Sequence, residues 1–171
     1  NVLTRKKNFT AMISSRGCPY LCSFCDQKFP LFRRRSAESF VDEVSRNYKE
    51  YGVREFDIYD STFTAGRKRV IEICDRLEEQ NLDVGFTIRS RVDSVNEKVL
   101  DALKRGGCHT IFYGIESADK DLLKIMRKNI SVERIRKTIN YTKKIGIDVL
   151  GYFMLGFPGE TKATARKTVE F

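Results

Sequence analysis

Short runs of β-branched and aromatic residues alternate along this chain with longer stretches in which apolar residues recur every three or four positions. The short runs are typical of strands, and they cover residues 10–14, 54–59, 84–88, 110–115 and 148–155. The longer stretches are typical of amphipathic helices, and they cover residues 36–51, 66–80, 96–105, 120–127 and 132–145, with a further helix beginning near Glu160. Strands that alternate with helices predict right-handed crossovers and a parallel sheet.

The number of strand–helix units sets the fold class. A closed barrel of eight such units usually needs about 250 residues, and this chain has 171. The five to six units that the pattern predicts indicate an α/β fold, either a partial, open parallel βα barrel or an open sheet that curls part of the way. We expect residues 1–171 to form one domain. Both alternatives place ligands at the carboxyl ends of the strands.

Composition is that of a globular domain. Hydrophobic residues make up 41% of the chain and charged residues 32%, as in ordinary soluble domains. No apolar run is long enough to span a bilayer, and no signal-peptide pattern opens the chain. The five cysteines do not resemble a secreted disulfide framework, so we expect a cytoplasmic protein with no membrane contact. Because the sequence starts without Met and stops inside a predicted helix, we expect a segment of a longer chain whose flanking domains are absent.

The chain is basic, with a net charge of +9. Its Lys and Arg residues include the runs 5–7 and 33–35. One interpretation is a set of solvated faces and loops. The other is attraction of nucleic acid or another anion, and charge alone does not decide between them.

Three cysteines, Cys18, Cys22 and Cys25, carry the clearest chemistry. Their C-x3-C-x2-C spacing follows the first predicted strand, so they lie in a loop at the ligand-binding edge of the sheet. Iron–sulfur cubes are normally held by four thiolates, and three would leave one iron open. The alternative is a zinc site that borrows a distant fourth ligand, such as Cys108 or His109.

With the aromatic residue Phe24 just before its last cysteine, this loop resembles that of the radical S-adenosylmethionine (radical SAM) enzymes. The resemblance implies a partial barrel of the radical SAM type. It also implies that Cys18, Cys22 and Cys25 hold a 4Fe–4S cluster whose open iron is chelated by the methionine part of S-adenosylmethionine. Reductive cleavage would then yield a 5′-deoxyadenosyl radical that abstracts hydrogen from the substrate.

The second and third strands end in residues that the resemblance assigns to the methionine part. Asp60 stands where many members carry Gly-Gly-Glu, and it could accept a hydrogen bond from the ammonium group. Arg91 could form a two-pronged pair with the carboxylate, and it matches the family's placement better than Arg89. A turn-forming aspartate and a surface arginine are the respective alternatives.

The fourth and fifth strands end in residues that the resemblance assigns to the nucleoside. Glu116, in Gly-Ile-Glu-Ser, would accept hydrogen bonds from the ribose hydroxyls. Met154 would lie against adenine, and Gly156 would let the backbone approach it closely. The alternatives are a helix-capping glutamate for Glu116 and plain core packing for Met154.

The strand-end motifs most resemble radical SAM enzymes with a cobalamin-binding domain. This similarity implies a methyl transfer or a ring-forming reaction, on a small-molecule substrate rather than on RNA. It also implies an external electron donor such as flavodoxin or ferredoxin. The alternatives are an RNA-modifying enzyme similar to the methylthiotransferases, and a non-catalytic iron–sulfur or zinc module.

Overall fold

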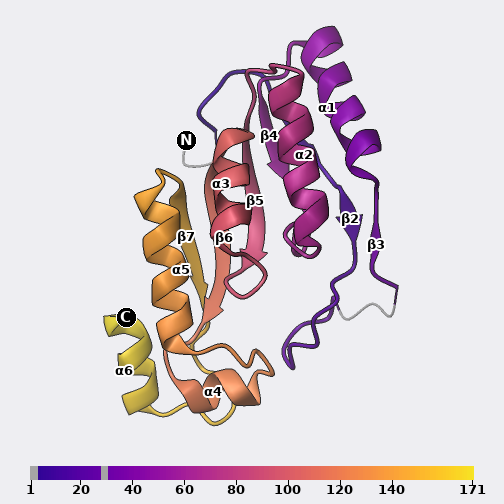
Figure 1. Ribbon diagram of the computed structural model, residues 1–171. Helices are drawn as coiled ribbons and strands as arrows, with labels where there is room; N and C mark the ends of the chain where they lie inside the picture. The colour runs from indigo at the N-terminus through magenta and orange to yellow at the C-terminus, as the bar shows by residue number, and fades with distance from the viewer. Residues whose placement is uncertain (1–3, 28–30) are drawn as a thin grey trace.

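A five-stranded parallel sheet organises the molecule. The computed structural model describes residues 4–27 and 31–171. The sheet order is β1-β4-β5-β6-β7, and its strands are Phe9–Met12, Glu55–Ile58, Gly85–Arg91, Cys108–Glu116 and Asp148–Phe153. All four neighbouring pairs are parallel. The predicted α/β fold, a partial and open parallel barrel, is therefore confirmed (Figure 1).

In the described part of the chain, six helices connect or follow these strands. They are α1 (Ala37–Tyr51), α2 (Arg67–Glu79), α3 (Glu97–Arg105), α4 (Lys120–Ile125), α5 (Val132–Lys144) and α6 (Lys162–Glu170). Helices α1, α2, α3 and α5 cover one face of the sheet, whereas α4 lies at the carboxyl edge of the strands (Figure 1). None of the described helices is long and apolar enough to cross a membrane.

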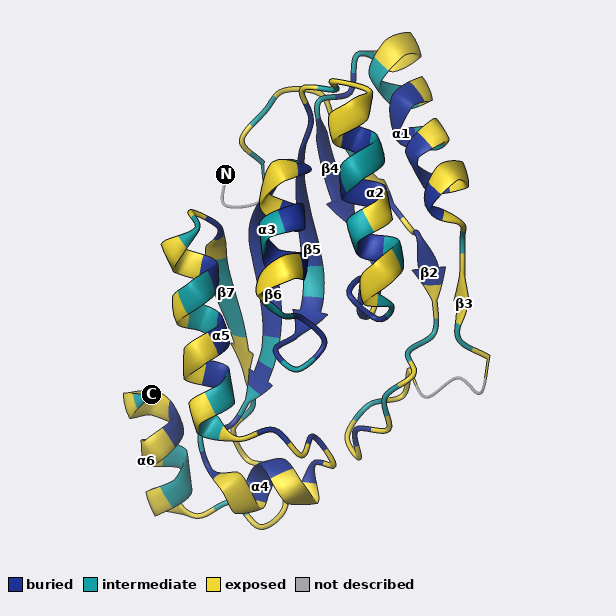
Figure 2. Ribbon diagram, viewed as in Figure 1, coloured by how far each residue is buried: buried dark blue, intermediate teal, exposed yellow. Residues whose placement is uncertain are grey.

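The core lies between the sheet and this helical layer (Figure 2). Alternate strand residues such as Phe56, Ile88 and Ile111 are at most 1% exposed, and each contributes about 1.5–3 kcal/mol by burial. Helix caps match the sequence pattern. Ser36 accepts a hydrogen bond from the Ser39 amide at the start of α1, and Gly52 ends that helix with a left-handed φ of 66°, which suits glycine.

Most elements begin and end within two residues of the predicted bounds, and two departures are larger. Strand β5 continues to Arg91, past the predicted end at residue 88, because it keeps pairing with β6 as far as Gly114. A short antiparallel ribbon of β2 (Ser15–Arg16) and β3 (Arg33–Arg34) was not predicted. Strands of two residues are too short to show any periodicity, so sequence pattern cannot find them.

The amino ends and the carboxyl ends of the parallel strands, here called the amino edge and the carboxyl edge of the sheet, have different contacts. At the amino edge, the buried Glu55 carboxylate accepts hydrogen bonds from the backbone amides of Arg5 and Lys6, at 3.1 and 3.0 Å. His109 Nε2 lies 2.6 Å from the other Glu55 oxygen. These contacts hold the start of the described chain against the amino edge. The carboxyl edge carries the cysteine loop and α4, and it positions the candidate site.

Candidate functional site

The cysteine loop leaves β1 through an anchor built on Asp60. This carboxylate is 1% exposed and accepts four hydrogen bonds of 2.6–3.0 Å, from the backbone amides and hydroxyls of Ser14 and Ser15. Asp60 lies at the carboxyl end of β4, where the sequence placed it. Its oxygens are used to fix the start of the loop, and the expected contact with an ammonium group stays a prediction.

The three loop cysteines are free thiols. Cys18 Sγ lies 3.5 Å from Thr62 Oγ1, and Cys22 is 8% exposed. Among residues 4–27 and 31–171, no three His, Cys, Asp or Glu side chains are gathered as a metal site. The donor set itself, three thiols within eight residues, fits an iron–sulfur cluster.

A zinc site completed from β6 does not agree with the topology. Cys108 and His109 open this strand at the amino edge, whereas the cysteine loop lies at the carboxyl edge. The strand has nine residues, so its first and last residues lie about 26 Å apart at about 3.3 Å per step. Neither side chain can reach the loop while the sheet is intact. His109 is instead paired with Glu55.

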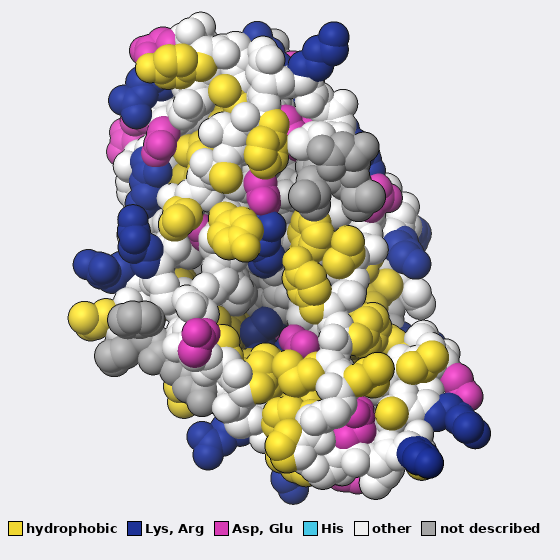
Figure 3. All heavy atoms as spheres, turned by 180° about the vertical axis from the view of Figure 1, so that it is seen from behind, with side chains coloured by type: hydrophobic (Ala, Val, Ile, Leu, Met, Phe, Trp, Pro, Cys, Tyr) yellow, Lys and Arg dark blue, Asp and Glu magenta, His cyan; other side chains and the backbone are white. Residues whose placement is uncertain are grey.

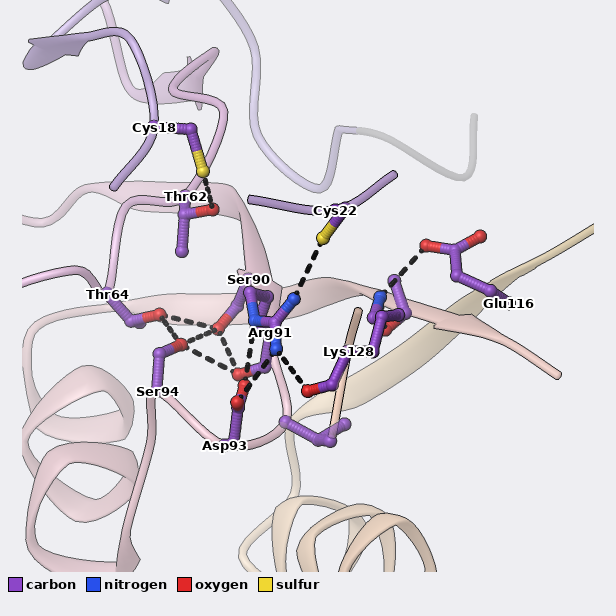
Figure 4. Close-up of polar contacts among 12 residues, drawn as sticks. Cys18, Cys22, Thr62, Thr64, Ser90, Arg91, Asp93, Ser94, Glu116 and Lys128 are labelled. Atoms are coloured by element: carbon purple, nitrogen blue, oxygen red, sulfur yellow. Dashed lines mark hydrogen bonds and ion pairs between the residues drawn. The ribbon is translucent and has the colours of Figure 1, made fainter. Parts of the chain in front are cut away.

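Arg91 connects the end of β5 to the cysteine loop (Figure 4). Its Nη1 donates to Cys22 Sγ at 3.1 Å, and its Nε and Nη2 donate to the two oxygens of Asp93 at 2.9 and 2.8 Å. Nη2 also donates to the Lys128 carbonyl, and the guanidinium lies 4.1 Å from the Tyr20 ring centroid. Burial lowers the pKa of Arg91, but hydrogen bonds and charge from Asp93 outweigh this and raise it.

The guanidinium therefore places a positive charge beside Cys22, which would stabilise a thiolate at that position. All three of its nitrogens already have partners in the protein. The predicted contact between Arg91 and a methionine carboxylate stays a prediction. Asp93 and Tyr20 were not expected to hold this arginine.

Glu116 ends β6 next to a lysine that the sequence did not reveal. Its backbone is left-handed, with φ of 69°, and its Oε1 lies 3.1 Å from Lys128 Nζ. That ammonium also donates to the Gly114 carbonyl at 2.8 Å. A Cβ atom at Gly114 would lie 2.7 Å from Glu116 Oε1, so glycine makes room for this pair. Nothing in the local sequence distinguishes Lys128, because a buried lysine has no pattern of its own.

The remaining predicted residues meet at the same edge. Met154 donates its backbone amide to the Glu116 carbonyl at 2.9 Å, which keeps the ends of β6 and β7 together. Gly156 has φ of 80°, and a Cβ built on it would meet nothing within 4 Å. The Phe24 ring contacts Phe157 edge-on, with ring centroids 6.4 Å apart. The cysteine loop thus contacts the Gly-Phe-Pro run through Phe24 and Phe157.

The face of the sheet opposite the helices is hollowed (Figure 3). A cavity of about 720 Å³ opens there, beside the start of the cysteine loop at Gly17. Its walls include Ile13, Tyr59 and Tyr152. This places a space of small-molecule size next to the loop.

Comparison with known proteins decides the family. Residues 12–171 match the Radical SAM superfamily. This chain belongs to the radical SAM superfamily.

Two relatives within the superfamily are similar in sequence to most of this chain. An uncharacterized methyltransferase of Pyrococcus horikoshii is 39% identical over 166 residues, which are 95% of this chain and 36% of the relative. Anaerobic magnesium-protoporphyrin IX monomethyl ester cyclase of Rubrivivax gelatinosus is 33% identical over 158 residues, or 90% of this chain and 28% of the relative. The chain thus spans about a third of the length of these relatives.

A solved structure of similar fold is the radical SAM methyltransferase TsrM of Kitasatospora setae with cobalamin and a [4Fe-4S] cluster bound. Its TM-score is 0.85 at 21% identity, and the match covers 95% of this radical SAM chain and 34% of TsrM. The likeness supports the shared fold of the partial barrel.

Proposed function

We propose that this chain is the core of a cobalamin-dependent radical SAM enzyme that transfers a methyl group or forms a ring on a small molecule. The observation that carries the proposal is the three-cysteine loop, held at the carboxyl edge with Arg91 on Cys22. The methyltransferase and cyclase names of the relatives support the reaction class. The cobalamin in the structure of TsrM supports that cofactor.

The loop thiols of Cys18, Cys22 and Cys25 would hold the 4Fe–4S cluster. When bound, the cluster supplies the electron that cleaves S-adenosylmethionine to a 5′-deoxyadenosyl radical. Arg91 keeps Cys22 oriented through its contacts with Asp93 and the Lys128 backbone. The protein would thus position the cofactors and shield them from water, while the cofactors supply the reactive chemistry.

The nucleoside would lie across the ends of β6 and β7. Glu116 would offer its carboxylate to the ribose diol, and the ion pair with Lys128 holds that carboxylate in place. The open space at Gly156 suits a flat ring against the backbone. Phe24 and Phe157 would keep water from this edge.

A small-molecule substrate is favoured over RNA because part of the basic run is used inside the protein. Arg34 donates to the Ala65 carbonyl, and Arg35 pairs with Glu43 and donates to the Ser39 carbonyl. These two guanidiniums fix the segment before α1 through contacts within the protein. Fewer cationic groups are therefore left to bind the phosphates of an RNA. The RNA-modifying alternative would need them free.

An external electron donor would approach from the opposite side of the loop. A hollow of about 990 Å³ there is lined by Tyr20, by the basic residues Arg67, Lys68 and Arg69, and by Glu72 and Asp93. Tyr20 stacks on Arg91, which contacts Cys22. A basic surface so close to a cluster ligand suits an acidic carrier such as flavodoxin or ferredoxin.

Anaerobic reconstitution of the full-length protein tests the function. Reduction in the presence of S-adenosylmethionine should release 5′-deoxyadenosine, and Cys18→Ala, Cys22→Ala or Cys25→Ala should abolish both the cluster absorption and this product. Cys74→Ala, which removes a buried thiol of α2, is the matched control. Bound zinc, or a cluster that survives loss of a loop cysteine, would overturn the proposal.

Cobalamin dependence has its own measurement. The full-length protein should bind cobalamin. It should transfer the labelled methyl group of S-adenosylmethionine to the substrate, or close a ring in the substrate, only when cobalamin is present. Equal turnover without cobalamin would refute the proposed cobalamin dependence, but it would leave the proposed radical SAM reaction intact.

A further inference from the structure

Two arginines face each other on the ribbon that closes the cysteine loop. Arg16 of β2 lies directly opposite Arg33 of β3, and both side chains are exposed. Like charges opposite each other on paired strands are destabilising. Within the described residues neither guanidinium has an acidic side chain within ion-pair distance, unlike Arg35 and Arg89. The pair therefore leaves positive charge uncompensated at this spot.

Both arginines line the 720 Å³ cavity of the open face. The same cavity is lined by the apolar or aromatic side chains of Ile13, Tyr59 and Tyr152. The Tyr152 ring stacks on Phe112 at 5.9 Å between centroids, with 20° between the planes. The Tyr152 ring is thus backed by a packed aromatic side chain, and its exposed surface suits a planar or apolar group.

The other charged groups of this cavity already have partners. Arg89 pairs with both oxygens of Asp57, and its guanidinium lies over the Tyr59 and Phe112 rings at 4.2 and 5.1 Å. Asp60 accepts its four hydrogen bonds from Ser14 and Ser15. Among the described charged residues that line this cavity, Arg16 and Arg33 are the two without an ion-pair or carboxylate hydrogen-bond partner.

We propose that Arg16 and Arg33 together bind a carboxylate or phosphate of the substrate, whose planar or apolar body lies on Ile13, Tyr59 and Tyr152. The inference rests on the proposed function, because it assigns the substrate of that radical reaction. An oxyanion between two guanidiniums turns their repulsion into two charge-assisted contacts. It also orients the substrate body and holds closed the ribbon that flanks the cysteine loop.

Binding of model ligands to the full-length protein tests the site without turnover. We expect 2-naphthoate or 2-naphthyl phosphate to bind, and Arg16→Gln or Arg33→Gln each to weaken that binding about tenfold. Neutral 2-naphthylmethanol should bind the variants and the wild type equally. Tyr152→Ala should weaken all three ligands, and Arg46→Gln on the exposed face of α1 is the matched charge control. Fluorescence titration measures each dissociation constant.

Unchanged affinity for both anionic ligands in the two arginine variants would overturn the proposal. So would an equal loss of S-adenosylmethionine affinity by equilibrium dialysis, because the arginine pair would then belong to the cofactor. The melting temperature of each variant should equal or exceed that of the wild type, since a repulsion is removed, and a lower value would contradict the premise. Failure of the radical reaction would appear separately, as no 5′-deoxyadenosine from the wild type.

Discussion

Asp60 and Arg91 show how residues at the site combine structural and chemical roles. Each lies at the strand end where the sequence placed it, and each is engaged by protein groups. Asp60 holds the two serines that begin the cysteine loop, and Arg91 holds its second cysteine. The sequence indicated the edge of the sheet to which both belong. Asp60 bonds Ser14, 46 positions away, and Arg91 bonds Cys22, 69 positions away, so local pattern could not predict these two contacts.

The two classes of cysteine should differ in reactivity. Burial raises the pKa of Cys74 to about 12 and raises that of Cys108 well above its usual value. Because the thiolate is the nucleophile, iodoacetamide at pH 8 should label Cys18 and Cys25 in the metal-free native protein and leave Cys74 and Cys108 unmodified. Mass spectrometry of peptides gives the labelled sites.

Cluster reconstitution should protect all three loop cysteines from labelling. Unfolding in urea should expose Cys74 and Cys108, which provides the positive control. Rapid native labelling of Cys74 would contradict its burial in the helix–sheet core.

At the scale of elements, short segments around the site depend on contacts between helices. Asp119 caps α4 by accepting hydrogen bonds from the Asp121 and Leu122 amides, and it pairs with Lys167 of α6 at 2.9 Å. A hydrogen bond from Lys167 lowers the pKa of Asp119. This one carboxylate therefore joins two helices that the sequence predicted only separately.

The lowered pKa gives stability a pH dependence. The Asp119 contribution is fully present above the pKa of an unfolded aspartate, about 3.9, and is lost as pH falls through the lower folded value. We expect Asp119→Asn, which keeps the cap but not the charge, to lower the free energy of unfolding at pH 7 and to reduce its decline between pH 5 and 3.

Urea denaturation across that pH range measures the effect. Asp121→Asn, at an exposed position of the same helix, is the matched control and should follow the wild-type pH profile more closely. An identical pH profile for Asp119→Asn and the wild type would contradict the ion pair with α6.

At the scale of the whole molecule, the one-sided helical layer creates two different surfaces beside one loop. The open face carries the cavity at Arg16 and Arg33, and the opposite side carries the basic hollow at Tyr20. The cysteine loop lies between them. The proposed substrate and the proposed electron donor would therefore approach the cysteine loop from separate directions.

The basic hollow predicts electron transfer that depends on salt. Lys68→Glu, at an exposed position, should slow reduction of the reconstituted cluster by flavodoxin about tenfold at low ionic strength, because steering by charge raises association rates. The difference should shrink in about 1 M salt, where the screening length is roughly 3 Å. Stopped-flow absorbance measures the rate. Lys49→Glu near the far end of α1 is the control, and equal slowing by both substitutions would refute docking at the hollow.

The sequence by itself determined the alternation of strands and helices, the parallel partial barrel and the family. Each depends on the periodicity of apolar residues or on the spacing of residues in short motifs, and both can be read from neighbouring positions in the chain. Only the tertiary structure revealed the β2–β3 ribbon, with Arg16 opposite Arg33, and the burial of Lys128. It also revealed that Asp60 and Arg91 are already hydrogen-bonded to protein groups. Those features arise from contacts between residues far apart in the chain, whose distance and burial exist only once the sheet has formed.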